Sequence, residues 1–123
     1  MGDDELLAML ATETERRAPG VIEAIKTLAA SAEPDSEKVE EIRVEIHGLK
    51  GAASVVGASR LAELAQEIEV ALVRRTTPGT LTPELASALI DATIALRDGA
   101  RAAAQGEPEP ASVAVGLATL ADA

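Results

Sequence analysis

Cysteine and aromatic residues are both absent from the 123 residues of this chain. Without cysteine, the protein can form no disulfide, no thiolate nucleophile and no cysteine-based zinc site. Without Phe, Tyr or Trp, the core has to be built from aliphatic side chains, which favours closely packed helices over a β-sandwich. Long apolar runs are also missing, because none approaches the roughly 18 residues that a membrane span needs. The acidic N-terminus lacks the basic region of a signal peptide, so we expect a cytoplasmic location.

Basic residues are scarce, with 11 Lys and Arg against 21 Asp and Glu and a formal net charge of −10. A protein that binds nucleic acid through the phosphate backbone needs a basic face, so we expect no nucleic-acid partner. An anionic membrane surface is disfavoured for the same reason, and we expect no membrane insertion. The acidic surface would instead attract a protein partner with a basic rim.

Apolar residues recur at helical spacing along most of the chain, and strict period-two alternation is absent. Short connections between long helices place neighbours antiparallel, so the pattern predicts an all-α, antiparallel four-helix bundle with an additional short C-terminal helix. One domain should span residues 1–123. We expect Pro19-Gly20 to kink the first helix or divide it into two collinear segments, 3–17 and 20–31, and residues 76–82 to form a loop. The expected helices are 3–31, 36–56, 59–75, 83–105 and 111–121.

The only histidine, His47, lies on the second of these helices. At about 100° per residue, the apolar seam of this helix is centred about 130° away from His47, so the imidazole should be exposed. Gly51 lies one turn further on, about 40° from His47, and Gly48 lies at about 100°. Glycine costs roughly 0.5–1 kcal/mol relative to alanine inside a helix. Close helix packing would explain the two glycines, but the outward direction of Gly51 favours clearance for something approaching the imidazole.

Two cations flank His47 on the same helix, Lys50 at i+3 and Arg43 at i−4. Both would discourage protonation of the imidazole and would complement a phosphoryl group placed on it. Aliphatic residues also fall on the outward side of the helix, which indicates a docking patch for another protein. We expect four positions to contact this partner: Val44, Gly48, Gly51 and Val55.

The turn between the second and third helices predicts a partner for His47. Gly57 ends the second helix, and reflecting the antiparallel pair about a turn near residue 58 brings position 69 opposite position 47. Glu69 occupies that position and could accept the Nδ1 proton of His47, which would leave Nε2 unprotonated, outward and nucleophilic. Glu67 is the alternative, because a shift of one or two residues at the turn would hand it the same role.

A pattern of 24 residues resembles the histidine phosphotransfer (HPt) family. It consists of His47-Gly48-Leu49-Lys50-Gly51, then Gly57, then Leu61, Leu64 and Glu69, where the family has His-x-Leu-Lys-Gly, a glycine six residues on and a leucine-rich helix. The full chain is most similar to the N-terminal phosphotransfer (P1) domain of chemotaxis-type histidine kinases, a subgroup with a fifth helix and a glutamate paired with the histidine. Ile46 departs from the small residue often found before the histidine, and Pro19-Gly20 interrupts a helix that is usually continuous.

The resemblance implies a phosphoryl carrier in two-component signalling. His47 would be phosphorylated on Nε2 by an ATP-binding histidine kinase domain and would pass the group to an aspartate of a response-regulator receiver domain. Lys50 would help neutralise the phosphoryl group, Gly51 would provide access and Glu69 would orient the ring. The domain would act as a monomer and without a cofactor. The Gly106–Pro110 segment and the weak last helix are typical of the edge of a linker, so we expect a fragment of a larger kinase.

The sequence disfavours three other functions: a metal centre, a hydrolase and an ATP-binding kinase. One histidine and no convincing acidic cluster are too few ligands for a metal centre. A histidine on a convex helix has neither the pocket nor the oxyanion hole of a hydrolase. No phosphate-cradling glycine loop occurs, so the chain should bind no ATP and should contain no kinase catalytic site. The alternative that stays open is a helical interaction or inhibitory module that carries no phosphohistidine.

Overall fold

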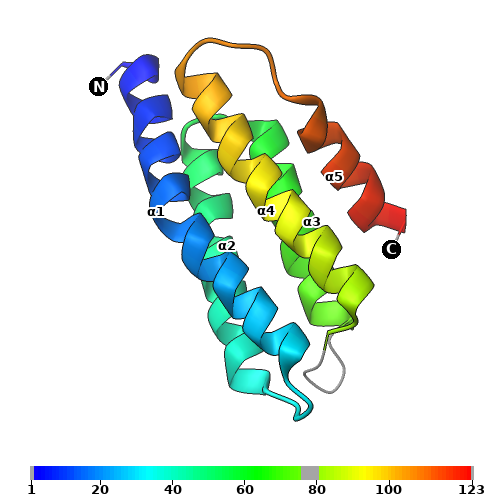
Figure 1. Ribbon diagram of the computed structural model, residues 1–123. Helices are drawn as coiled ribbons and strands as arrows, with labels where there is room; N and C mark the ends of the chain where they lie inside the picture. Colours follow the sequence, from blue (N-terminus) through cyan, green and yellow to red (C-terminus); the bar gives the residue numbers. More distant parts are fainter. Residues whose placement is uncertain (1, 76–80, 123) are drawn as a thin grey trace.

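The computed structural model describes residues 2–75 and 81–122, and this part of the chain contains five helices and no strand (Figure 1). Helices α1 to α4 form an antiparallel bundle, and α5 packs against α3 and α4. The prediction of an all-α bundle with an additional C-terminal helix is therefore confirmed. The predicted loop over residues 76–80 lies outside the described residues. The helices are α1 Asp3–Ala30, α2 Ser36–Val55, α3 Ser59–Arg75, α4 Pro83–Ala104 and α5 Ala111–Asp122.

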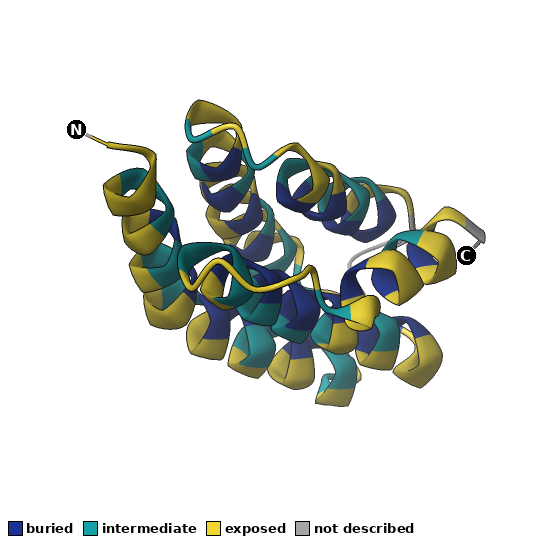
Figure 2. Cartoon of the chain, turned by 90° about the horizontal axis from the view of Figure 1, so that it is seen from above, coloured by how far each residue is buried: buried dark blue, intermediate teal, exposed yellow. Residues whose placement is uncertain are grey.

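The core is aliphatic, and every helix contributes one buried stripe to it (Figure 2). On α2 the stripe repeats every three or four residues, as expected for a helix that buries a single face. This stripe consists of Ile42, Ile46, Leu49 and Ala53, all of them 1% exposed or less. It fixes the rotation of α2 about its own axis, so it also fixes which residues of α2 point outward.

The expected division of α1 into two segments at Pro19-Gly20 is wrong, because α1 runs without a break from Asp3 to Ala30. Proline has no N–H to donate to the preceding turn, which normally destabilises a helix interior. Here the carbonyl left without its usual partner belongs to Glu15, and Glu15, Pro19 and Gly20 are all exposed, so water can reach this part of the helix. The buried positions before and after Pro19 also stay in phase on one face, and their burial holds the helix together. These positions are Leu10, Thr14, Ala18, Val21, Ile25 and Leu28.

The α2–α3 hairpin is closed by a glycine in the left-handed backbone region. Gly57 has φ +77°, which other residues adopt at a steric cost. The N–H of Ala58 donates to the carbonyl of Ala53 at 2.9 Å, and the N–H of Gly57 donates to that of Ser54 at 3.1 Å. These two bonds form a Schellman motif, which satisfies the last carbonyls of α2. The motif fixes where α3 starts and therefore the register of the whole hairpin.

Helix α4 begins with the signal expected from its sequence. The hydroxyl of Thr82 accepts a hydrogen bond from the N–H of Leu85 at 3.2 Å, and Pro83 is the first helical residue. Helix α5 then lies close against its neighbours because Gly116 faces Leu64 and Ala92, where an added Cβ would come within 3.2 Å of Leu64 Cδ1.

Within the described ranges, no helix combines the length and apolar character required to cross a membrane.

Candidate functional site

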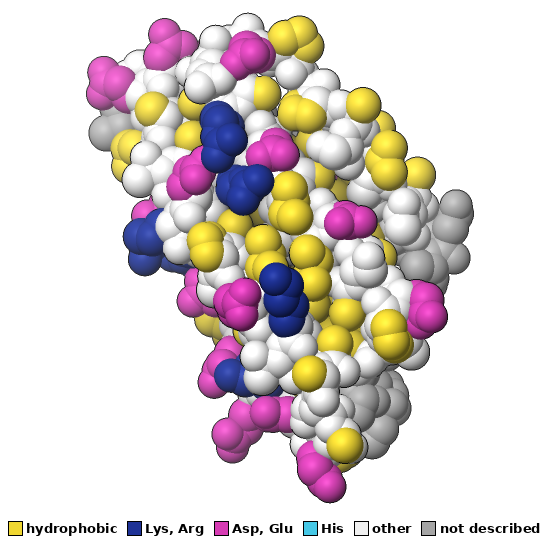
Figure 3. All heavy atoms as spheres, in the orientation of Figure 1, with side chains coloured by type: hydrophobic (Ala, Val, Ile, Leu, Met, Phe, Trp, Pro, Cys, Tyr) yellow, Lys and Arg dark blue, Asp and Glu magenta, His cyan; other side chains and the backbone are white. Residues whose placement is uncertain are grey.

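His47 projects from the outer face of α2. Its side chain is 60% exposed, while the preceding residue, Ile46, is fully buried and anchors the helix at this point. The face of the molecule formed by α1, α4 and α5 shows no histidine among its coloured atoms (Figure 3). The imidazole therefore lies on the side of the bundle formed by α2 and α3, where a partner can reach it.

Glu69 on α3 lies directly beside the imidazole. Nδ1 of His47 is 3.2 Å from Oε2 and 3.3 Å from Oε1 of Glu69. The carboxylate belongs to a side chain that is only 13% exposed, so an exposed ring meets a largely buried acid. The register set at the Gly57 turn thus brings together the pair that the hairpin reflection predicts, and the alternative, Glu67, makes no such contact among the described residues.

The environment of Glu69 keeps this carboxylate ionised. Burial alone would raise the pKa of Glu69, but hydrogen bonds from His47 and Arg43, together with the charges of His47 and Lys50, lower it below its ordinary value. An ionised carboxylate can only accept hydrogen bonds. The proton of a neutral imidazole must therefore sit on Nδ1 for the contact to form, and the lone pair of the ring is then on Nε2.

The two cations that flank His47 on α2, Arg43 and Lys50, differ in their contacts. The guanidinium of Arg43 donates to Glu69 Oε2 at 3.0 Å and to both oxygens of Glu40 at 2.7 and 2.9 Å. Its charge is therefore paired with two carboxylates, one of which also contacts the imidazole. Lys50 makes no ion pair with any described residue, although its charge contributes to the low pKa of Glu69. Lys50 is thus the cation near His47 that a new anionic group could engage.

The two glycines that follow His47 have different surroundings. A Cβ added at Gly51 would meet nothing within 4 Å, so the outer surface of α2 is open one turn beyond His47. A Cβ added at Gly48 would come within 2.5 Å of Nη1 of Arg17, which reaches over from α1. Gly51 therefore provides clearance from outside, whereas Gly48 also accommodates an arginine of the neighbouring helix. The sequence holds no signal for this contact, because the two residues belong to different helices.

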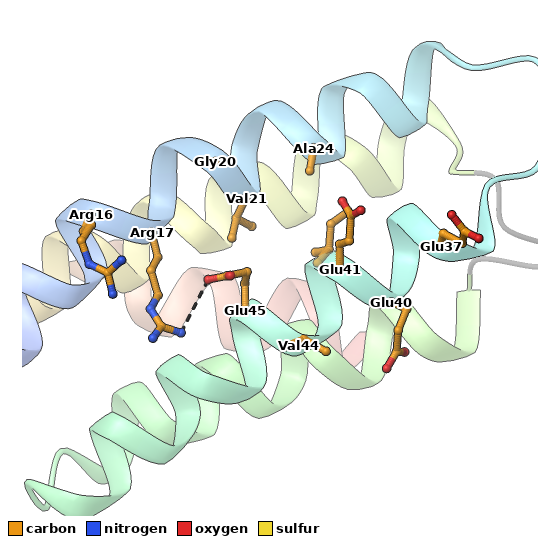
Figure 4. Close-up of a pocket in the computed structure, with 11 residues that line it drawn as sticks. Arg16, Arg17, Gly20, Val21, Ala24, Glu37, Glu40, Glu41, Val44 and Glu45 are labelled. Carbon is orange, nitrogen blue, oxygen red and sulfur yellow. Dashed lines mark ion pairs between the residues drawn. The ribbon is translucent and has the colours of Figure 1, made fainter.

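An open groove of about 750 Å³ runs between α1 and α2, and its lining on α2 ends at Glu45, two residues before His47 (Figure 4). Val44, three residues before His47, lines the groove on the α2 side and is 52% exposed. Four glutamates share this α2 side, and one of them, Glu45, lies 3.5 Å from Nη1 of Arg17 across the groove. The four are Glu37, Glu40, Glu41 and Glu45. Val55, further along α2, is 81% exposed.

The arrangement has the parts needed for nucleophilic chemistry by one imidazole and lacks those of a metal centre. Among the described residues, no group of three or more His, Asp and Glu side chains could hold a metal ion. The ring offers an exposed Nε2 lone pair, with a carboxylate behind it that stabilises positive charge on the ring. A nearby ammonium group and an open helix surface complete a site that suits the transfer of an anionic group.

Comparison with known families agrees with this chemistry. The chain matches the family model described as Hpt domain over residues 5–104, so it belongs to the Hpt domain family. Hpt domains have a phosphotransfer role in two-component signalling and interact with response-regulator receivers and kinases. The match covers α1 to α4 and ends before α5. No curated protein and no solved structure matches the chain.

Proposed function

We propose that His47 carries the phosphoryl group, on Nε2. The observation that carries this proposal is the pairing of an exposed imidazole with a largely buried, ionised carboxylate, Glu69, at 3.2 Å from Nδ1. Because Nδ1 holds the proton, Nε2 is the atom that can attack phosphorus. Lys50 supplies positive charge for the bound phosphoryl group, and Gly51 leaves room for the donor and the acceptor.

The charge on the ring changes during the reaction in a way that Glu69 can stabilise. When the Nε2 lone pair attacks the γ-phosphorus of ATP held by a kinase domain, an N–P bond forms and the P–O bond to ADP breaks. The ring, still protonated on Nδ1, becomes a phosphoimidazolium with a positive charge that faces Glu69. In the onward step a carboxylate oxygen of an aspartate attacks phosphorus, the N–P bond breaks and its electron pair returns to Nε2. The Nδ1 proton stays in place throughout.

We propose further that the domain is of the P1 type found in chemotaxis-type histidine kinases. Two observations support this assignment beyond the Hpt match: a fifth helix, α5, packs against α3 and α4, and a glutamate pairs with the histidine. In this proposal residues 1–123 form a single monomeric domain. A histidine kinase domain donates the phosphoryl group to His47, and a response-regulator receiver accepts the group from His47.

The receiver domain is proposed to dock over the groove between α1 and α2 and the adjoining outer surface of α2. Val44 gives the groove an apolar edge beside His47, and Gly48, Gly51 and Val55 continue the outer surface of α2. The α2 side of the groove carries four glutamates, so the docking face of the receiver should combine apolar and basic residues. Such a face would hold the receiver's aspartate near Nε2.

Transfer to a receiver domain tests the docking surface. Glu41→Lys reverses a charge on the α2 side of the groove, and we expect it to slow transfer to the receiver roughly tenfold while phosphorylation by a small phosphodonor is unchanged. Glu63→Lys, on α3 and away from the groove, is the matched control. Equal transfer rates for both variants would place the receiver elsewhere.

The variant His47→Gln distinguishes a phosphoryl carrier from a module that only binds a partner. If the domain only binds a partner, this variant keeps its biological effect. If His47 carries phosphate, the variant can receive none from a cognate kinase and ATP, and the receiver stays unphosphorylated. Binding of the kinase domain serves as the control that the variant is folded.

A further inference from the structure

Arg43 connects two carboxylates that belong to different helices. Its Nε and Nη2 atoms donate to the two oxygens of Glu40, at 2.9 and 2.7 Å, and both residues lie on α2. The remaining nitrogen, Nη1, donates to Oε2 of Glu69 on α3 at 3.0 Å. A guanidinium is rigid and planar, so the two bonds to Glu40 fix the direction in which Nη1 points.

The oxygen that Arg43 holds is also the one nearest to the imidazole. Oε2 of Glu69 lies 3.0 Å from Nη1 of Arg43 and 3.2 Å from Nδ1 of His47. A glutamate side chain has several rotatable bonds, and an exposed ring that can itself rotate is a weak anchor for it. Arg43, with a side chain 32% exposed, is the more constrained of the two partners, so it determines where the carboxylate sits.

The charges of the cluster also favour a positioning role. The pKa of Arg43 is raised by its hydrogen bonds to Glu40 and then to Glu69, so the guanidinium stays charged. One positive charge between two carboxylates leaves a net charge of about −1 facing the ring. Glu40 therefore neutralises the charge of Arg43. Glu69 then keeps its own negative charge and can stabilise positive charge on His47. Lys50, which has no such commitment among the described residues, stays available to the phosphoryl group.

We propose that Arg43 is a positioning residue for phosphoryl transfer, which holds Glu69 in the orientation that keeps the proton of His47 on Nδ1. The inference rests on the proposed function, since it concerns the reactivity of His47. It assigns different roles to the two cations that flank His47 on α2: Arg43 acts through Glu69, and Lys50 acts on the phosphoryl group. Glu40 supports Arg43 from the same helix.

The single histidine of the chain allows a direct test. The ¹⁵N shifts of the His47 ring report which nitrogen carries the proton, without overlap from another histidine. We expect the neutral ring of the unchanged protein to be protonated on Nδ1, and Arg43→Gln to move it towards a mixture of both tautomers. In parallel, phosphorylation of His47 by phosphoramidate should slow roughly tenfold, and Arg43→Lys, which keeps the charge, should recover part of the rate.

Two further variants keep the result interpretable. Arg60→Gln removes an arginine that bonds a glutamate from another segment, Glu109, at 3.3 Å, and should change neither the tautomer nor the rate. Glu40→Gln should shift both readouts in the same direction as Arg43→Gln but less, and it remains informative if Arg43→Gln does not fold. Unchanged tautomer and rate in both Arg43→Gln and Glu40→Gln would overturn the inference.

The outcomes separate this inference from the proposed function. If the unchanged protein accepts no phosphate from any donor while Arg43→Gln still alters the tautomer, the proposed function fails and the positioning of the ring by Arg43 stands. If the unchanged protein is phosphorylated on His47 and folded Arg43→Gln behaves identically, the proposed function stands and the role of Arg43 is refuted.

Discussion

Nδ1 of His47 lies 3.2 Å from Oε2 of Glu69, although the two residues are 22 positions apart in the sequence. The contact joins α2 to α3 at the surface, and it depends on the register that Gly57 sets at the hairpin turn. A one-residue change at that turn would rotate Glu69 away from the ring. The reactivity of the histidine is therefore linked to the backbone geometry of a turn more than two helical turns away.

Replacing Glu69 by alanine should affect chemistry more than folding. We expect Glu69→Ala to slow phosphorylation of His47 roughly 10- to 100-fold, because the ring loses its orienting partner and the stabilisation of its positive charge. The free energy of unfolding should fall by about 1 kcal/mol or less, because the two residues that lose the carboxylate, His47 and Arg43, both keep access to water. Glu67→Ala is the control and should leave the rate unchanged. Unfolding of Glu69→Ala would instead show a structural role.

The pKa of Glu69 makes part of the stability depend on pH. Because this pKa is lowered in the folded protein, the folded state binds the proton more weakly than the unfolded state does. The resulting stabilisation is present above the ordinary glutamate pKa of about 4.3 and is lost as the pH falls through the lower folded-state pKa. The difference in unfolding free energy between the unchanged protein and Glu69→Gln should therefore shrink on acidification, measured by denaturant unfolding at pH 7 and pH 3. A difference independent of pH would contradict this assignment.

Gly51 and Gly20 form a matched pair for measuring what an open glycine costs a helix, and Gly51 alone lies one turn from His47. Both lie in helices, and an added Cβ at either would meet nothing within 4 Å. Alanine at each position should stabilise the fold by roughly 0.5–1 kcal/mol. A larger residue at the site, Gly51→Gln, should also slow transfer to the receiver, because it occupies the space beside His47 that the partner needs. Ala118→Gln, at an exposed position of α5 that does not line the groove, should have no such effect, and an equal loss of transfer in both variants would refute clearance as the role of Gly51.

The proline inside α1 is tolerated at a cost that can be measured. Pro19→Ala restores a backbone N–H in the middle of a 28-residue helix. We expect it to raise the free energy of unfolding by about 1–2 kcal/mol, since the restored bond outweighs the added flexibility of the unfolded chain. Phosphorylation of His47 should not change. A lower melting temperature for Pro19→Ala would mean that the proline stabilises α1 in a way that the structure does not show.

The sequence was sufficient to predict features that depend on local periodicity. The seam of α2, the outward direction of His47 and the five helices, whose ends lie within one residue of those expected, all follow from the spacing of apolar residues and from capping signals. The pairing of His47 with Glu69 was also accessible, because a short turn leaves few possible registers.

Features that depend on side chains from several helices were not predictable in the same way. The helical angles place Arg43 beside His47, but they do not reveal that Glu40 and Glu69 hold its guanidinium. Arg17 of α1 lies against Gly48 of α2, and no pattern in the local sequence indicates this contact. The expected break at Pro19 was wrong because burial of the flanking positions outweighs the local preference of proline.

Mass spectrometry of the protein after incubation with phosphoramidate is the direct test of the proposal that His47 carries a phosphoryl group. We predict one added phosphoryl group, located on His47, that is lost in acid, retained in base and absent from His47→Gln. If His47 stays unmodified with small phosphodonors and with histidine kinase domains supplied with ATP, or if His47→Gln is modified to the same extent, the proposal is contradicted.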